Sequence, residues 1–262
     1  MNNYRKYGEK PFKIIVIHGG PGAIGDMKPV AKELSDEYSV IEYLQTAETI
    51  DGQVEELHNI VKNNSDKPLI LIGHSWGAWL AYIYTSRYLN NIKKLILVGS
   101  GPFKDEYASQ IMETRLHRMD KDERKEFDRL IRELHSDDSG SKEMIISRFG
   151  ELMTNSDSFN PIPKENNTIE VNMEIYRKVW KEAEKMRKNG ELLEIGKKIN
   201  CPVTAIHGEY DPHPSEGVRE PLSKIIEDFH IILLERCGHK PWIEKEAKNT
   251  FYEVLRKELS TV

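Results

Sequence analysis

The 262-residue chain has few cysteines, no basic excess and no long hydrophobic run. Its two cysteines, Cys201 and Cys237, are too few for a disulfide framework and do not form a Cys-x-x-Cys pair. Such sparse cysteine use is typical of a reducing compartment. The first ten residues are polar, so we expect no secretory signal there. The sequence therefore predicts a cytoplasmic protein.

Charge and hydrophobicity exclude two classes of partner. Lys and Arg number 38 against 43 Asp and Glu, which gives a net charge of −5. A nucleic-acid or anionic-membrane surface would favour a basic excess. The longest aliphatic runs have four residues, whereas a membrane-spanning helix needs about 20 apolar residues. We therefore expect no nucleic acid and no membrane, and a small molecule or short peptide as substrate. No pattern in the sequence predicts an oligomeric state.

Short aliphatic runs alternate with helical patterns outside the middle of the chain. The runs cover residues 13–18, 39–44, 69–72, 95–98, 203–206 and 230–234. Near-continuous aliphatic strands are typical of a sheet that is buried on both faces. The alternation predicts an α/β protein with a mostly parallel central sheet flanked by helices. Only 12 residues precede the first run, so we expect strands before it to be largely missing.

Helical patterns link these runs. Apolar residues recur at helical spacing over 26–37, 51–61 and 76–88, and Asp26 is a candidate N-cap of the first of these helices.

The alternation stops at Gly101-Pro102 and resumes at Cys201-Pro202. The 98 residues between them contain no clear strand, and 40 of them are charged. We therefore predict a core of residues 1–102 and 201–262 that carries a helical cap inserted at 103–200. Within the cap, the pattern predicts helices over 121–135 and 172–189, the second ending at Gly190, and a loop over 160–167.

A Gly-x-Ser-x-Gly motif, Gly73 to Gly77, lies between a predicted strand and a predicted helix. Such a turn forces its serine into a strained conformation, and its two glycines, Gly73 and Gly77, let strand and helix approach closely. The serine oxygen then stands at the carboxyl edge of the sheet, beside a helix N-terminus. This context predicts that Ser75 is a nucleophile.

A second glycine-rich turn, His18-Gly19-Gly20-Pro21-Gly22, follows the first predicted strand. Such a backbone can point N–H groups outward, and acyl transfer needs donors of this kind for the negative charge on the carbonyl oxygen. We predict that the amides of Gly20 and Trp76 form an oxyanion hole and that His18 shapes the loop by hydrogen bonding. A phosphate-binding loop is the alternative, but the glycine pattern that it requires is missing.

A serine nucleophile needs a base and a carboxylate that orients the base. His239 lies in the loop after the last predicted strand, at the same sheet edge as Ser75. Asp211 follows the preceding predicted strand, with Glu209 as the competing carboxylate and His213 as the second candidate base. The order Ser, Asp, His is that of an α/β-hydrolase triad.

The sequence offers no sign of metal chemistry. It has no His-Glu-x-x-His motif and no Cys and His pairs at ligand spacing. We expect neither a metal nor a cofactor. Cys237 lies two residues before His239, and we interpret it as a small buried side chain near the site.

These motifs and the helical insertion resemble an α/β-hydrolase with a helical cap. The His-Gly-Gly-Pro-Gly turn and Gly73-His-Ser-Trp-Gly77 together resemble the proline iminopeptidase branch. In that branch the serine attacks the amide after an N-terminal residue, usually proline, and acidic residues reached from the cap hold the free amine. The resemblance implies the roles already given to Ser75, Asp211, His239, Gly20 and Trp76.

The cap would select the substrate. By position in the cap, Glu170 and Glu174 are candidates to bind an amine, or they are solvated glutamates. Tyr176 and Trp180, one helical turn apart, could line an apolar pocket or pack the cap on the core, and packing is favoured.

The sequence thus predicts a serine hydrolase that acts on a small amide or ester through an acyl-enzyme. A proline iminopeptidase-like aminopeptidase is the most specific hypothesis. A carboxylesterase or other small-molecule acyl hydrolase is the alternative within the same chemistry. A non-catalytic, ligand-binding hydrolase fold is the alternative from another class.

Overall fold

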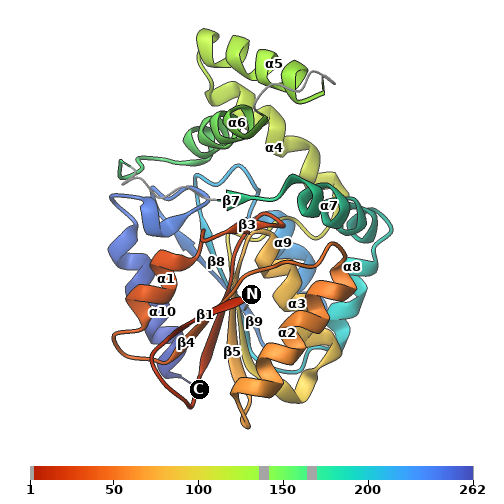
Figure 1. Cartoon of the computed structure of the whole chain (residues 1–262), viewed down its shortest axis with the longest axis vertical. Coiled ribbons are helices and arrows are strands. Elements are labelled where there is room, and N and C mark those ends of the chain that lie inside the picture. Colours follow the sequence, from red (N-terminus) through yellow and green to blue (C-terminus); the bar gives the residue numbers. More distant parts are fainter. Residues whose placement is uncertain (1–2, 136–141, 164–169, 262) are drawn as a thin grey trace.

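A seven-stranded sheet forms the centre of the computed structural model, which describes residues 3–135, 142–163 and 170–261 (Figure 1). The strand order is β1-β4-β2-β5-β6-β8-β9. Strand β1 pairs antiparallel with β4, and every other neighbouring pair in this sheet is parallel. The strands are β1 (Tyr4–Tyr7), β2 (Ile14–Ile17), β4 (Val40–Tyr43), β5 (Leu69–His74), β6 (Ile92–Val98), β8 (Val203–Gly208) and β9 (Phe229–Leu234). The predicted α/β class and mostly parallel sheet are confirmed.

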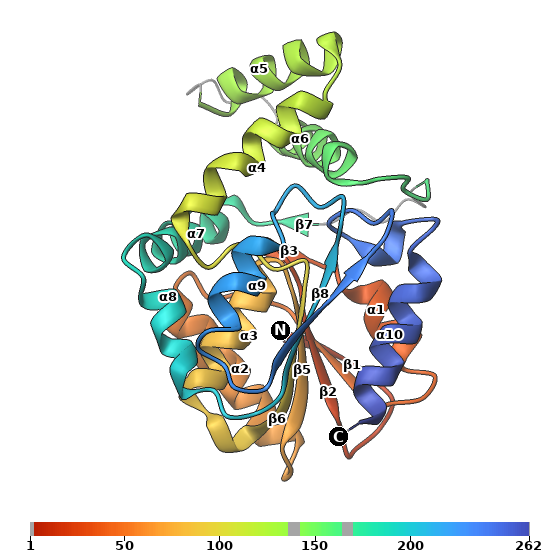
Figure 2. The same cartoon turned by 180° about the vertical axis from the view of Figure 1, so that it is seen from behind.

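Helices cover both faces of the sheet. Helices α1 (Lys28–Leu34) and α10 (Lys248–Ser260) lie on one face (Figure 1). Helices α2 (Ile50–Asn64), α3 (Trp76–Arg87) and α9 (Glu216–Leu222) lie on the other (Figure 2). Successive strand residues point to opposite faces, so Ile14 and Val16 pack toward α1 and α10 while Ile15 and Ile17 join the cluster around α3. Two buried faces explain why the strands are aliphatic along their whole length.

A group of helices rises above the carboxyl edge of the sheet, between β6 and β8 in the chain (Figures 1 and 2). These helices, called the cap below, are α4 (Asp105–Arg118), α5 (Lys121–His135), α6 (Lys142–Asp157) and α7 (Met173–Lys188). The single turn α8 (Glu191–Glu194) follows α7 and lies beside α3, where the Leu193 carbonyl accepts a hydrogen bond from the Tyr82 hydroxyl at 3.1 Å. A small cluster joins Met119, directly after α4, to Leu130 of α5 and Leu152 of α6. Helical turns of 3-10 type cover Leu89–Asn91, Ile195–Lys198 and Pro241–Ile243. The division into core and cap at 102/103 and 200/201 stays a prediction.

Three expectations need correction. Strand β7 (Glu170–Val171), which pairs with β3 (Ala23–Ile24), lies in the region expected to lack strands. A leading antiparallel strand, β1, is present, although its sequence, two adjacent basic residues between two tyrosines, gave no strand signal. Helix α1 begins at Lys28 behind Met27, so Asp26 does not cap it. Asp26 instead binds partners distant in the sequence, which a local pattern cannot reveal.

Helix α7 agrees with the prediction, since it begins after Asn172 and ends before Asn189. Of the predicted loop at 160–167, residues 160–163 are non-helical and residues 164–167 lie outside the described part. Within the described residues, no helix combines the length and the apolar character that crossing a bilayer requires.

Candidate active site

Ser75 occupies a sharp turn between β5 and α3. Its backbone has φ 53° and ψ −116°, a region that non-glycine residues rarely adopt. A Cβ on Gly73 would lie 2.2 Å from the carbonyl oxygen of Gly77, and a Cβ on Gly77 would lie 2.3 Å from that of Ile17. A side chain at either position would therefore clash with the neighbouring backbone, so both positions require glycine. Because the surrounding backbones fix the turn, Ser75 is held in a conformation that costs on the order of 1–3 kcal/mol.

The glycine-rich turn after β2 lies against this serine. A Cβ on Gly19 would be 3.1 Å from the Ser75 Cβ, and Gly20 has φ 50°. The buried His18 ring contacts the Gly19 carbonyl through Nδ1 at 2.9 Å and accepts from the Gln45 amide through Nε2 at 3.2 Å. His18 thus has the bonds that a loop-shaping residue needs.

Gly22 closes the same turn beneath the cap. With φ 77°, it accepts a hydrogen bond at 3.1 Å from the amide of Asn172, the residue that caps α7. The turn is therefore attached to the first residues of α7.

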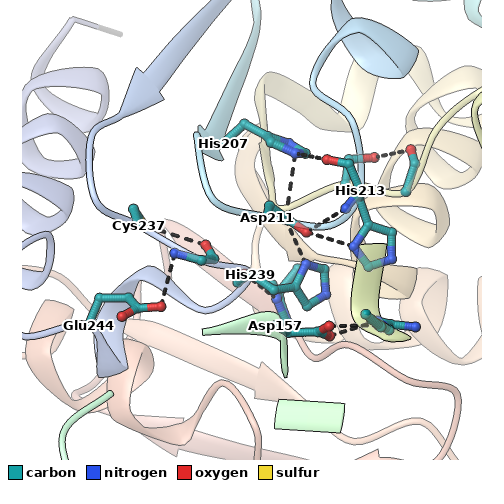
Figure 3. Close-up of polar contacts among 12 residues, drawn as sticks. Asp157, His207, Asp211, His213, Cys237, His239 and Glu244 are labelled. Atoms are coloured by element: carbon teal, nitrogen blue, oxygen red, sulfur yellow. Dashed lines mark hydrogen bonds and ion pairs between the residues drawn. The ribbon is translucent and has the colours of Figure 1, made fainter. Parts of the chain in front are cut away.

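The buried carboxylate of Asp211 holds two histidine rings (Figure 3). Its Oδ2 accepts from Nδ1 of His239 at 2.7 Å, and its Oδ1 accepts from Nδ1 of His213, also at 2.7 Å. The amide of His213 donates to the same Oδ1 at 2.9 Å. The two rings stack with centroids 4.3 Å apart. Asp211 therefore joins the loop after β8 to the loop after β9.

Burial and charge act in opposite directions on these groups. Burial raises the pKa of Asp211, but the neighbouring His239, His213 and His207 outweigh it and hold that pKa well below 3.8. Burial lowers the pKa of His239 below 6.5, and the Asp211 carboxylate only partly opposes this. The pKa of His213 is lowered for the same reasons. At neutral pH the site combines a charged carboxylate with two neutral imidazoles, each able to accept a proton.

Asp211, His213 and His239 are also a group that could ligate a metal, because one atom from each lies within 4.8 Å of the others. In the structure the Nδ1 atoms of His213 and His239 instead face the Asp211 carboxylate. The expectation of no metal and no cofactor stays a prediction.

Polar contacts hold the His239 loop from two sides. His74 contacts Asp26 through Nδ1 at 3.0 Å and the His239 carbonyl through Nε2 at 3.1 Å. Lys240 pairs with the same Asp26 at 2.5 Å. On the other side, the amide of His239 donates to the carbonyl of Asp157 at 2.9 Å, at the end of α6. The loop is thus attached to β5 and to the cap.

Glu244 reinforces the second attachment (Figure 3). Its fully buried carboxylate accepts hydrogen bonds from the amides of Gly238 and Phe159 at 2.9 Å each and of Asn160 at 2.8 Å. One side chain therefore connects the His239 loop to the chain that leaves α6. Cys237, in the same loop, is fully buried, and burial raises the pKa of its thiol.

A cavity of about 340 Å³ opens above the serine, between sheet edge and cap. It is lined by Gly20, Pro21, Ser75, Trp76, Trp79, Gly101, Pro102, Ala108, Ile111, Met112, Arg115, Tyr176, Trp180, Arg187, His213 and His239. The predicted nucleophile, the predicted base and both residues of the predicted oxyanion hole thus face one space. His213 faces it too, so contact with Asp211 alone does not separate the two candidate bases.

The predicted cap residues divide into two groups. Tyr176 and Trp180 line the cavity and stack on each other at 6.1 Å, and Trp180 also stacks on Trp79 of α3 at 5.8 Å. They serve both of the purposes considered for them, since they line a pocket and pack the cap on the core. Glu174 is exposed, pairs with Lys178 at 2.8 Å and does not line the cavity. Glu170 lies in β7, with its backbone opposite Ile24. Amine binding by either glutamate stays a prediction.

Sequence reasoning missed Arg115, Arg187 and Trp79 in the cavity wall and Glu244 behind it. The two arginines stand among many charged cap residues, so composition did not distinguish them. Trp79, four residues after Ser75, would have been accessible to an argument from helical spacing. Glu209, the competing carboxylate, is exposed, and its amide pairs with the carbonyl of Leu234.

The alpha/beta hydrolase fold family model matches residues 14–246. Among curated proteins, the chain is 27% identical over 254 residues to a proline iminopeptidase of Heyndrickxia coagulans, covering 88% of this chain and 85% of that one. It is 25% identical over 212 residues to monoacylglycerol lipase ABHD6 of Homo sapiens, covering 76% of this chain but only 58% of the lipase.

Solved structures give the same fold. VinJ superposes with a TM-score of 0.71 at 17% identity, over 98% of this chain and 94% of that one. A proline iminopeptidase of Mycobacterium smegmatis superposes with a TM-score of 0.65 at 17% identity, with the same coverage.

The attachment through Glu244 predicts a stability effect. In E244Q, one carboxylate oxygen becomes an NH2 group that cannot accept, so at least one backbone N–H that donates to this buried side chain loses its partner. The free energy of unfolding should fall by about 1–3 kcal/mol in urea denaturation. E253Q, which changes an exposed glutamate on α10, should stay within about 0.5 kcal/mol of wild type. Equal stability of the two variants would contradict the role assigned to Glu244.

Proposed function

Since the chain belongs to the alpha/beta hydrolase fold family, we propose that it is a serine hydrolase whose substrate is a small carboxylic ester. The observation that carries the proposal is the convergence of Ser75 and the Asp211–His239 pair on one cavity. Ser75 supplies a nucleophile in a strained turn, and His239 supplies a neutral base held by a buried carboxylate. Covalent acyl transfer needs these two groups together.

The proposed reaction has two halves. Neutral His239 takes the proton of Ser75 while the serine oxygen attacks the substrate carbonyl. The amides of Gly20 and Trp76 stabilise the oxyanion, and the N-terminus of α3 adds a favourable field. His239 then protonates the leaving alcohol, and an acyl-enzyme remains. Water attacks the acyl group by the same route, releases the acid and restores Ser75.

The cavity wall favours an ester over an aminopeptidase substrate. Holding a free α-amine in a partly dry cavity requires a nearby carboxylate. Among the described residues, those that line this cavity include no Asp or Glu.

A proline iminopeptidase-like activity is the second candidate, supported by the relative in Heyndrickxia coagulans that is matched over most of both chains. Cleavage of an L-proline amide that is lost when the amine is blocked would favour it over the ester.

Replacing the nucleophile gives the first test of activity. We expect wild type to hydrolyse p-nitrophenyl butyrate and S75A to lose turnover by several orders of magnitude, because no covalent intermediate can form. A fluorophosphonate probe should label wild type and fail to label S75A, as read by intact mass. Unlabelled wild-type protein without esterase activity would support a non-catalytic binding fold instead.

The two histidines on Asp211 can be separated by a matched pair of variants. Asparagine keeps an N–H donor near the position of Nδ1 but cannot accept a proton. If His239 is the base, H239N should lose several orders of magnitude in kcat for p-nitrophenyl butyrate, whereas H213N should lose about tenfold. The reverse ranking would make His213 the base. Circular dichroism of both variants serves as the folding control.

The lowered pKa of His239 predicts the acid limb of the pH profile. The base works only when its imidazole is neutral, so activity is present above its pKa and disappears as pH falls through it. Because burial lowers that pKa below 6.5, the midpoint of kcat/KM for an uncharged ester should lie below pH 6.5. A midpoint above this value would mean that another group limits the reaction or that the ring is less buried during catalysis.

A further inference from the structure

The wall of the cavity is cationic on the cap side. We propose that this cavity selects an ester that carries a carboxylate, and that the guanidinium group of Arg187 is the specificity-determining partner of that carboxylate, with Arg115 as a second cation in the same cavity wall. This inference rests on the proposed hydrolase function and names the class of its substrate. It reverses the charge that an amine-binding cap would require.

Arg187 lies near the end of α7 and is almost completely buried, with its side chain 7% exposed. Its Nε and Nη2 bind Oδ1 of Asp105 at 3.1 Å, and its guanidinium carbon lies 5.7 Å from the Trp79 ring centroid. These contacts fix the orientation of the planar group. An arginine held in this way recognises a carboxylate with little further loss of side-chain freedom.

Arg115 of α4 has a similar arrangement. Its Nε and Nη2 form two hydrogen bonds to Asp157, at 2.6 and 2.7 Å. The backbone carbonyl of Asp157 also accepts a hydrogen bond from the amide of His239. Arg115 is therefore both a lining residue and part of the support of the proposed base.

The acidic partners of these arginines stand behind the wall. Neither Asp105 nor Asp157 lines the cavity, whereas both arginines do. The side chain of Asp105 is 49% exposed, so water screens its charge more than that of the buried Arg187. Each ion pair thus turns its positive end toward the cavity.

Donor capacity remains on both arginines. Among the described residues, the Nη1 atoms of Arg115 and Arg187 have no hydrogen-bond partner. The one described side-chain polar atom that is both fully buried and without a partner is Nδ1 of His207. The two Nη1 atoms are therefore not fully buried and are accessible to open space. The open space that both side chains share is the cavity. An anionic group in it would receive donors that the protein leaves unused.

The rest of the lining suits the remainder of such a molecule. Trp79, Trp180 and Tyr176 form a stacked aromatic wall, and Ile111 and Met112 add apolar surface. The lowered pKa values of His213 and His239 leave these rings uncharged at neutral pH. The two guanidinium groups are then the formal charges that face the substrate among the described lining residues.

The test compares matched ester pairs that differ only in a carboxylate. On the acyl side, mono-p-nitrophenyl adipate is paired with p-nitrophenyl hexanoate. On the leaving-group side, 4-acetoxybenzoate is paired with its methyl ester. We expect wild type to prefer the anionic member of at least one pair by about tenfold or more in kcat/KM, because a hydrogen bond between charged groups contributes about that much.

Variants of Arg187 assign the preference to this residue. R187M keeps the aliphatic volume and removes the charge, and it should reduce the anionic-to-neutral ratio of kcat/KM by about tenfold, mainly through KM. R187K should restore part of the ratio. R177Q is the matched control, because Arg177 lies on the exposed side of the same helix and does not line the cavity, so the ratio should not change.

The outcomes separate this inference from the function on which it rests. Equal or better hydrolysis of the neutral ester in both pairs, or a ratio that R187M does not change, overturns the inference while esterase activity stands. Preference for an ester bearing an amine would also overturn it. If wild type hydrolyses none of the esters and is not labelled by the fluorophosphonate probe, the proposed function is wrong.

Discussion

The charge of Asp211 is the constraint on which the candidate site depends. A carboxylate with no exposed side-chain surface is very costly unless donors surround it. Here the donors come from the His239 ring and from the ring and amide of His213. Satisfying this one charge therefore aligns the loops after β8 and β9 and aims two imidazoles at the cavity. Both rings are neutral at neutral pH all the same, because burial lowers their pKa values by more than the carboxylate raises them.

The cap contributes more than a cover. The carbonyl of Asp157 at the end of α6 accepts a hydrogen bond from the amide of His239, and the buried carboxylate of Glu244 accepts three hydrogen bonds from the neighbouring backbone. Arg115 holds the same stretch through Asp157. Groups that would bind substrate and groups that would hold the base are thus connected within a few residues. A cap substitution near Asp157 would consequently affect both binding and catalysis.

The charge of the cavity wall differs from what the motif resemblance implies. The motifs resemble those of the proline iminopeptidase branch, in which a cap carboxylate meets a free amine. The wall here presents two guanidinium groups and aromatic surface, while Glu174 pairs with Lys178 outside the cavity. The proposed catalytic residues lie in loops at the sheet edge, whereas the two arginines lie on α4 and α7. The motif residues therefore do not determine the charge of the cavity wall.

Local patterns in the sequence determined the sheet, the turn at Ser75 and the helix that follows it. Each follows from strand aliphaticity, glycine spacing or helical periodicity, which act between near neighbours. The sequence also pointed to Asp211 and His239, because loops at the carboxyl ends of parallel strands meet at one edge. Tertiary structure alone decided which charges are buried together. Asp26 does not cap α1 but contacts His74 and Lys240. Arg115 and Arg187 line the cavity, although many other residues of the cap are charged. Pairing over such separations depends on how the helices pack, and no spacing along the chain encodes it.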